Sequence, residues 1–583
     1  MTIGEGDVAA TTARRSPADR VRAYLGGDGR VIERILFVVT LVIVGYLVLA
    51  PLAFLVYNTF VGPAGPTVDA VIAAAQADGA GEMLVNSLIF AAGSAVVAMI
   101  PGTALAYLTI RTNAPLKPIL FAISLVPLII PGILFTVAWV YLLSGRIGVI
   151  NKALEALGFG FLSFDVFSMG GMILVEGLHM SPIVFLLMAA AFRSLDPSLE
   201  ESALMSGAGL SSVIRRITLP LVRPALLAAL LVMVVRALEG FETPAILGIP
   251  EGTFVLTSRI FLALSTFPVR YDLAGAYSLG LVLITFIMLA LYRWFNRQSE
   301  RYQVITGKGY RPHTLELGRW KWPIGVLFVV YFVLVVVSPL AILVYMSLLP
   351  FYTPPSIDML HLMSLDNYLR MFHLRDVAGA LRNSFVLAIS SATIVMILMA
   401  VAAWVVVRSR VRFRYGLDAL SMTPLSFPGV VIGVALIFLY LRFPLDIYAT
   451  LWILLIAYVT QFLPYGMRYT SASMFQVGRE LEESAAMSGA GWRQTFQRIV
   501  LPLIFPGLLA GWIYIMIVSV RQLSSSILLY APGTEVFSVL MWQLYTDGYT
   551  TTLAAVGVST VFVLMLLAAL AHRIGSRVGV RVA

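Results

Sequence analysis

Twelve apolar stretches, each long enough to cross a lipid bilayer, dominate this sequence of 583 residues. A helix that crosses the hydrocarbon core needs roughly 20 apolar residues, and helices satisfy their own backbone hydrogen bonds inside lipid. Only 12% of the residues are charged, against about a quarter in soluble proteins. We therefore predict an all-α, polytopic membrane protein with spans near 35–58, 85–110, 119–143, 169–192, 224–248, 274–292, 323–348, 384–407, 417–441, 449–468, 507–530 and 552–572.

Basic residues gather on one side of the predicted spans. Of the 40 Lys and Arg residues, 30 fall in the two tails and in the loops of that side. Because loops rich in Lys and Arg stay in the cytoplasm, we expect both termini to be cytoplasmic. The net charge of +10 is thus mainly an orientation signal. No basic face of a folded soluble region indicates a nucleic-acid partner, and the lipid bilayer is the expected surroundings.

The chain contains an internal repeat. The phrase LEESALMSGAG begins at Leu199 and returns as LEESAAMSGAG at Leu481, and the 30 positions from each start share 19 identities. Other positions match at an offset of 297, namely Arg111 with Arg408, Pro127 with Pro424 and Pro131 with Pro428. Six spans in each half keep the two halves parallel. We predict a cytoplasmic tail at 1–34, a first half at 35–292, a cytoplasmic linker at 293–322 and a second half at 323–583.

Both copies of the phrase carry one spaced pattern: Glu-Ser-Ala, three residues, Gly, nine residues, then Ile-x-Leu-Pro. This pattern resembles the EAA signature of the membrane subunits of binding-protein-dependent type I ABC importers, with Ser in place of the first Ala. The resemblance covers nearly the whole chain and implies the type I importer permease fold, with two parallel six-helix repeats. It also implies that an ATPase docks on the loops 193–223 and 476–506 through Glu201, Ser202, Ala203 and Gly207, and through Glu483, Ser484, Ala485 and Gly489.

The expected partners follow from this resemblance. The only lysine that follows a glycine, Lys308, is followed by Gly309 and not by the Ser or Thr of a phosphate-binding loop. We therefore expect no enzyme activity and no cofactor in this chain, with ATP-Mg bound by a separate ABC ATPase present in two copies. An extracytoplasmic solute-binding protein and the bacterial inner membrane complete the expected setting. The sequence has no cysteine and no metal-ligand spacing, so we expect no resident metal.

Two further segments bear on the substrate. RQLSSSILLYAPGTEVFSVLMWQLY, from Arg521, resembles the corresponding part of ferric-iron importer permeases, and EGFETPAILGIP, from Glu239, resembles its first-half counterpart. Gln522 stands where that family usually has Glu. Ferric iron is the expected substrate, with thiamine, polyamine or phosphonate as alternatives within the same importer class. A secondary transporter is the alternative mechanism, although its signature loop would lie between spans two and three.

Several charged or polar side chains fall within the spans, namely Arg236, Glu239, Glu242, Arg521 and Gln522. An ionised group in a bilayer costs at least about 2.5–3.5 kcal/mol, so such residues normally face a partner or a water-filled cavity. Glu239 and Arg521 occupy equivalent depths in the two halves. We predict that they approach each other beside the translocation pathway and help to close it. Local pairing of Glu239 with Arg236 is the alternative.

The paired prolines give the last prediction. Interior prolines remove a backbone hydrogen bond and bend a helix. Pro127 and Pro131, with Pro424 and Pro428, should therefore bend two equivalent spans and shape a central cavity.

Overall fold

The structure is a computed structural model that describes residues 28–62, 65–117, 120–121, 124, 126–196, 198–299, 314–374, 377–443 and 445–577. Among these residues, eight helices are long and apolar enough to cross a membrane, or ten if each of two sharply bent helix pairs is one span. One small antiparallel hairpin joins β1 (Val61–Gly62) to β2 (Gly65–Pro66). The prediction of an all-α, polytopic membrane protein is confirmed.

The first half contains the first six predicted spans. Its elements are α2 (Asp28–Phe60), α3 (Asp69–Gln76), α4 (Ala80–Arg111), η1 (Val126–Leu128), α6 (Gly132–Leu143), α7 (Val149–Ala156), η2 (Gly160–Leu162), α8 (Met169–Arg193), α9 (Ser198–Met205), α10 (Leu210–Val213), η3 (Ile214–Thr218), α11 (Leu219–Glu239), η4 (Pro244–Gly248), η5 (Ile249–Glu251), α12 (Leu256–Ser265) and α13 (Tyr271–Ser299).

The second half repeats this order. Its elements are η7 (Gly318–Trp320), α14 (Lys321–Phe332), η8 (Val333–Val337), α15 (Ser338–Ser347), η9 (Ile357–Leu362), α16 (Asp366–Leu374), α17 (Val377–Arg408), α18 (Arg414–Met422), η10 (Thr423–Ser426), α19 (Gly429–Tyr440), α20 (Leu451–Gln476), α21 (Arg479–Met487), α22 (Trp492–Thr495), η11 (Phe496–Val500), α23 (Leu501–Val520), α24 (Ser526–Leu529), α25 (Phe537–Thr546) and α26 (Thr550–Arg577).

The predicted span at 224–248 is wrong at its end. Helix α11 stops at Glu239, and the chain turns at Gly240 before a separate bent pair, Pro244–Glu251 and Leu256–Ser265, whose two parts meet at 76°. Gly240 has ordinary extended backbone angles, and a side chain there would press on the Ala237 carbonyl. Pro244 then opens the next element, since proline cannot continue a regular helix. Most of the predicted tail, residues 1–27, and the middle of the predicted linker, residues 300–313, lie outside the described residues.

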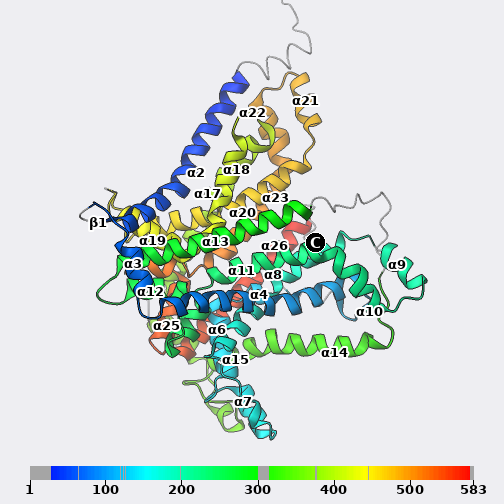
Figure 1. Cartoon of the computed structure of the whole chain (residues 1–583), viewed down its shortest axis with the longest axis vertical. Helices are drawn as coiled ribbons and strands as arrows, with labels where there is room; N and C mark the ends of the chain where they lie inside the picture. Colours follow the sequence, from blue (N-terminus) through cyan, green and yellow to red (C-terminus); the bar gives the residue numbers. More distant parts are fainter. Residues whose placement is uncertain are drawn as a thin grey trace, which may run out of the picture.

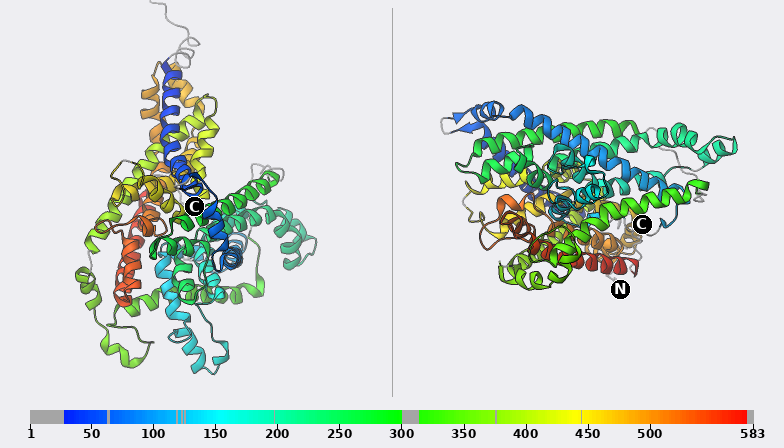
Figure 2. Two further views of the ribbon diagram at one scale, coloured as in Figure 1. Left: turned by 60° about the vertical axis from the view of Figure 1, so that its left-hand side comes forward. Right: turned by 90° about the horizontal axis from the view of Figure 1, so that it is seen from below.

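The two halves form two arms that share a base (Figure 1). Helices α4, α8, α11 and α14 run along one arm, and α17, α18, α20 and α23 run along the other, as a second direction of view also shows (Figure 2). Helix α2 belongs to the first half but runs along the second-half arm, where it packs against α17, α18 and α19 (Figure 1). In return, α15 packs against α6. Each half is thus held partly by the other.

Two pairs of prolines lie at breaks in equivalent spans. Helix α6 begins directly after Pro131 and α19 directly after Pro428, while Pro127 and Pro424 lie in the short turns η1 and η10 that precede them. Proline lacks an N–H and disfavours helix in the residue before it. The predicted bend is therefore a break, of 105° between Arg414–Ser426 and Gly429–Tyr440. Every residue of α6 and α19 is buried.

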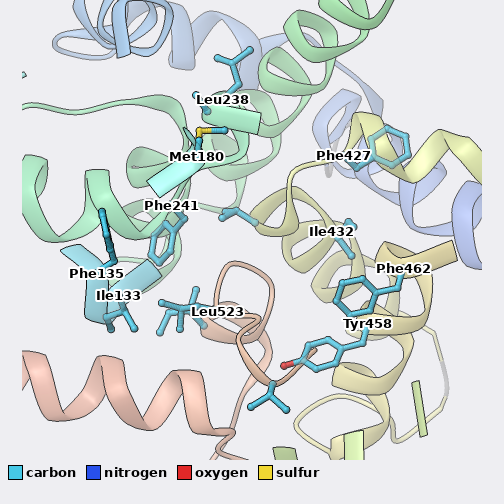
Figure 3. Packing of buried hydrophobic residues seen from close by; sticks show 14 of the residues in the cluster. Ile133, Phe135, Met180, Leu238, Phe241, Phe427, Ile432, Tyr458, Phe462 and Leu523 are labelled. Atoms are coloured by element: carbon cyan, nitrogen blue, oxygen red, sulfur yellow. The ribbon is translucent and has the colours of Figure 1, made fainter. Parts of the chain in front are cut away.

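The hydrophobic core continues from one half into the other. Phe135 and Phe241 of the first half and Ile432, Phe462 and Leu523 of the second belong to one buried cluster, and Leu523 lies beside the first-half side chains (Figure 3). Apolar packing at the shared base therefore holds the two arms together, while their far ends are separate.

Candidate functional site

The predicted docking residues lie on two short helices at the far ends of different arms, α9 and α21 (Figure 1). After each helix the chain turns through a glycine with φ of +83°, Gly207 in one half and Gly489 in the other. This left-handed conformation favours glycine, which is the residue that both copies of the repeated pattern have there. The two π-helical turns that follow, η3 and η11, also occupy equivalent positions.

The outer faces of α9 and α21 mix apolar and polar side chains. Ser202, Glu483 and Ser484 are exposed, Glu201 and Ala203 are half-buried, and Ala485 is buried. Met205 is 89% exposed and its counterpart Met487 is 47% exposed. A short helix with an exposed methionine and acidic residues in its first turns is suited to a hydrophobic groove of a partner.

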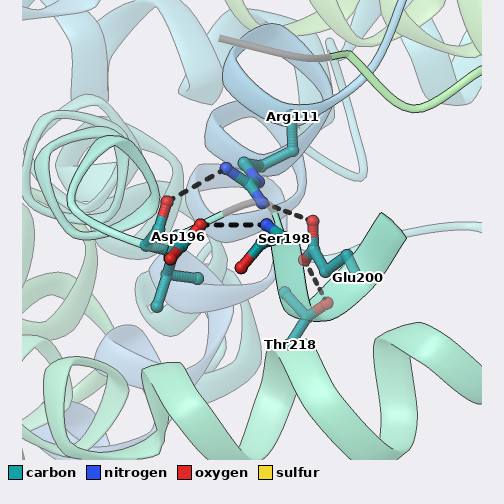
Figure 4. A network of polar contacts seen from close by, with 6 residues as sticks. Arg111, Asp196, Ser198, Glu200 and Thr218 are labelled. Atoms are coloured by element: carbon teal, nitrogen blue, oxygen red, sulfur yellow. Dashed lines mark hydrogen bonds and ion pairs between the residues drawn. The ribbon is translucent and has the colours of Figure 1, made fainter. Parts of the chain in front are cut away.

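The residue before each motif glutamate points inward instead. Glu200 is 2% exposed and forms a buried ion pair with Arg111, the last residue of α4 (Figure 4). Thr218, at the end of η3, donates a hydrogen bond of 2.6 Å to the other oxygen of the Glu200 carboxylate. The Arg111 guanidinium also donates to the Leu195 carbonyl, at 3.3 Å. One carboxylate thus connects α4, α9 and the start of α11.

Asp196 lies two residues before the first residue of helix α9, Ser198. Its carboxylate accepts a hydrogen bond of 2.9 Å from the Ser198 backbone N–H. This bond, together with the nearby Arg111 guanidinium, holds the pKa of Asp196 below its usual value.

The second half places Glu482 and Arg408 at the equivalent positions. Arg408 Nε lies 2.9 Å from Glu482 Oε1, although neither atom makes an aligned hydrogen bond. The Arg408 guanidinium instead donates to the backbone carbonyls of Met474 and Val477, at 3.1 and 2.5 Å. Burial raises the pKa of Glu482, which outweighs the opposing effect of Arg408.

The predicted approach of Glu239 to Arg521 is wrong. Glu239 pairs with Arg236, one turn earlier on α11, at 3.4 Å. Arg236 also reaches across the halves, where it donates a hydrogen bond to the Tyr465 hydroxyl of α20 and lies over the Tyr465 ring. Neighbours one helical turn apart meet more easily than residues on two helices whose rotation the sequence does not reveal. The local pairing named as the alternative is therefore the one observed.

Arg521 interacts electrostatically with Glu242 of the first half. The Glu242 carboxylate lies so close to the backbone of Gly132 that a side chain there would collide with it, and His179 lies on the same side. His179 stacks on Phe135 at 4.9 Å and contacts the Ile130 carbonyl. The first half therefore has an ionisable cluster where α6 begins.

A second carboxylate extends this cluster. Glu176 on α8 is buried and accepts a hydrogen bond of 2.7 Å from Thr243, whose hydroxyl lies 3.2 Å from that of Thr136 on α6. Among the described residues, no group of three or more His, Cys, Asp or Glu side chains is placed to hold a metal ion.

The second half has neutral side chains at the equivalent place. At the start of α19, Gly429 lies against Ser524, Gln522 and Gln461. Ser524 and Gln461 follow Glu242 and His179 by 282 positions. Tyr458 stands where the first half has Glu176, and its hydroxyl lies 2.8 Å from that of Ser526.

The search for motifs missed Glu200, Glu482, Glu176 and Tyr465. For the first two a signal existed, since Arg111 and Arg408 repeat at one offset and Glu200 and Glu482 at another. For Tyr465 none existed, because Ile183 is its repeat counterpart.

These features define a class of protein: a multi-pass helical membrane protein of two like halves, each with a short helix presented at the end of an arm. The particular family follows from comparison with known proteins. The chain belongs to the family of binding-protein-dependent transport system inner membrane components, whose model matches residues 98–301 and 393–579. It is a permease of the type I ABC importer class, and the recognition of a fused two-half permease is confirmed.

Two of the most similar curated relatives are described as ferric transport permeases. The chain is 28% identical over 468 residues to a putative ferric transport system permease of Haemophilus influenzae, covering 78% of this chain and 71% of the relative. It is 27% identical over 492 residues to a ferric transport system permease of Actinobacillus pleuropneumoniae, covering 83% of this chain and 69% of the relative. A putative 2-aminoethylphosphonate permease of Salmonella typhimurium is 24% identical, covering 29% of this chain and 64% of the relative.

Among solved structures, a bacterial ABC transporter involved in alginate import overlaps with a TM-score of 0.38 at 21% identity, covering 47% of this chain and 97% of that chain.

Proposed function

We propose that this chain forms the translocation pathway for ferric iron in an ATP-driven importer. The observation that carries the proposal is the match to two ferric permeases along about four fifths of the chain, because it includes both halves. The segments from Glu239 and from Arg521, which resemble ferric permeases, lie at the junction of the halves, where Arg521 and Glu242 influence each other electrostatically.

The chemistry of the junction supports a cationic substrate. The first half contributes three carboxylates, Glu176 within α8, Glu239 at the end of α11 and Glu242 just after it. The Thr243 hydroxyl donates to Glu176 and lies beside that of Thr136. Oxygen donors are those that hard cations prefer. We expect iron to pass this side of the junction.

The coupling follows from the placement of α9 and α21. In the proposal, one copy of a separate ATPase docks on each helix, and both helices lie on the cytoplasmic side together with the two termini. Closure of the ATPase pair would draw the two arms together and load the contact between Arg236 and Tyr465 at their base. A solute-binding protein would deliver the substrate from the opposite side.

A phosphonate substrate is the second candidate, favoured by the match to 2-aminoethylphosphonate permeases over 169 residues. That match covers less than a third of the chain, and the excess of carboxylates in the first half would repel an anion. A cation is therefore the better proposal.

Reconstitution tests the proposal. The chain is placed in liposomes with its ATPase and binding protein, and uptake of radioactive ferric iron and of labelled 2-aminoethylphosphonate is measured with ATP or with a non-hydrolysable analogue. We expect ATP-dependent uptake of iron that requires the binding protein. Uptake of phosphonate alone, or iron uptake driven by an ion gradient without ATP, would contradict the proposal.

A further inference from the structure

We propose that Arg111 with Glu200, and Arg408 with Glu482, are positioning links that make each docking helix move with its own arm, and that the first link is stiffer than the second. The inference rests on the proposed docking of an ATPase at α9 and α21, but not on the identity of the substrate. The four residues lie outside the docking motif itself, one position before it or at the end of a distant span.

The first link joins four elements through two buried side chains. Arg111 ends α4, Glu200 belongs to α9, Thr218 ends η3, and Leu195 follows α8. Both oxygens of Glu200 are engaged, one by Arg111 and one by Thr218. Arg111 and Glu200 are each 2% exposed, so neither water nor salt competes strongly for the pair. A displacement of α9 must therefore displace the ends of α4 and α11 as well.

The same arginine is tied to the segment that leads into the second half. Its backbone carbonyl accepts a hydrogen bond of 2.8 Å from the Leu315 N–H, and the Asn113 N–H donates to the Leu315 carbonyl at 3.0 Å. The Asn113 side chain accepts from the Leu317 N–H, also at 3.0 Å. Helix α14 begins a few residues later, so the first link also fixes the start of the neighbouring span.

The second link keeps the ion pair and loses its support. Val500 occupies the position that Thr218 has in the first half. Valine has no hydroxyl, so Glu482 lacks the hydrogen bond that Thr218 donates to Glu200. The side chain of Glu482 is 17% exposed, against 3% for Glu200, and the pair is poorly aligned. Arg408 is fixed by the Met474 and Val477 carbonyls rather than by the helix that it contacts.

The hydrogen bonds around Arg408 fix the chain just before α21, and they restrain α21 itself less than the first link restrains α9. Arg479, at the start of α21, donates to the Val407 carbonyl at 2.8 Å. This bond tethers the first residue of α21, whereas Glu200 holds α9 through a side chain that faces inward. We therefore expect α21 to pivot about its first turn and α9 to follow α4 as a rigid body.

The absence of native cysteine makes the test direct. One variant carries two spin-labelled cysteines, at Met205 and Ile100, and reports the distance between α9 and α4. A second variant carries them at the counterparts Met487 and Ile397 and reports the distance between α21 and α17. All four side chains are exposed. In the full chain in nanodiscs, we expect a narrow distance distribution for the first pair and a broader one for the second.

The decisive variants exchange Thr218 and Val500, the equivalent residues beside the two carboxylates, between the halves. Thr218→Val should broaden the first distribution toward that of the second, and Val500→Thr should narrow the second. Glu200→Gln should broaden the first further, since the isosteric amide keeps size and loses charge. Thr218→Val also keeps the measurement informative if Glu200→Gln does not fold.

Coupling separates a positioning role from a merely structural one. In the reconstituted complex, substrate transported per ATP should fall about fivefold or more in Glu200→Gln, at the lower end of typical coupling between two sites, and less in Glu482→Gln. An unchanged distance distribution in Glu200→Gln and Thr218→Val would overturn the link. A broadened distribution with unchanged transport per ATP would overturn its positioning role. Because the distances need neither ATPase nor substrate, failure of the iron proposal is recognised separately.

Discussion

The start of α6 in the first half and the start of α19 in the second have equivalent backbone conformations but different neighbouring side chains. Both helices begin at the glycine of a Pro-Gly pair, are buried throughout and lie at the base of the two arms. Around the first stand Glu176, His179 and Glu242. Around the second stand uncharged side chains, with Gln461, Gln522 and Ser524 against Gly429.

The repeat therefore determines the backbone at this place and leaves the charge of the surrounding side chains free to differ between the halves. The turns at Gly207 and Gly489 have one geometry, and the π-helical turns repeat in place. A backbone break needs only proline and glycine, which both copies keep. A buried carboxylate needs a partner or a polar surrounding, which the first half finds partly in the second, at Arg521.

The largest expected effect concerns the docking helices. Reversal of a charge in a complementary interface brings like charges of the two partners together, which costs several kcal/mol. Glu201→Lys combined with Glu483→Lys should therefore lower ATP-dependent uptake about 100-fold or more, while Glu316→Lys, on the linker, serves as a matched charge control. Each single change should weaken uptake less. Normal uptake by the double variant would refute docking at both helices.

The second prediction makes the first-half cluster resemble the second. Glu242→Ser introduces the residue found at position 524 and removes the carboxylate that acts electrostatically on Arg521. Since a charged group left without its partner costs about 2 kcal/mol, thermal unfolding in detergent should begin several degrees lower. Combination with Arg521→Gln should restore part of the loss. A double variant less stable than both single variants would show that the two residues act separately.

The third prediction concerns the contact between the arms. Tyr465→Phe keeps the ring and removes the hydroxyl that accepts from Arg236, a loss of about 1 kcal/mol. We expect faster ATP hydrolysis in the absence of binding protein, because the resting contact at the base is weakened. Tyr469→Phe, in the same aromatic group as Tyr514, is the matched control. Equal effects of the two changes would mean that the hydroxyl of Tyr465 has no special part.

The charge exchange of Arg236→Glu with Glu239→Arg refines the same contact. It should recover more uptake than Glu239→Arg with Arg521→Glu, because only the former pair is in contact. The opposite ranking would restore the original expectation for Glu239 and Arg521.

The smallest effect is expected from the prolines. Pro131→Ala and Pro428→Ala relax the chain at the two breaks at a cost of about 0.4–1 kcal/mol each, with expression intact and the transport rate lowered about two- to fivefold. Gly132→Ala should be worse than either, since its side chain would collide with Glu242. If both proline variants transport at the normal rate, packing alone holds the breaks open.

The sequence was sufficient for the membrane class and for the repeat with its two equivalent loops, because each of these follows from local composition or from spacing. Long apolar runs force helices in lipid, and a phrase repeated at one offset identifies equivalent loops without any knowledge of their contacts. The glycine turns after α9 and α21 were predictable for the same reason: the backbone requirement lies within a few residues of the signal.

The tertiary structure decided which side chains meet. Glu200 turns inward and Glu201 does not, although they are neighbours, because helix α9 has only one face toward Arg111. Glu239 pairs with Arg236, and Arg521 is left to Glu242, because the rotation of α11 and the early end of that helix set their directions. Equivalent positions in two repeats have the same height along the membrane normal. The direction in which a side chain points around its helix axis is set only by the packing of whole helices.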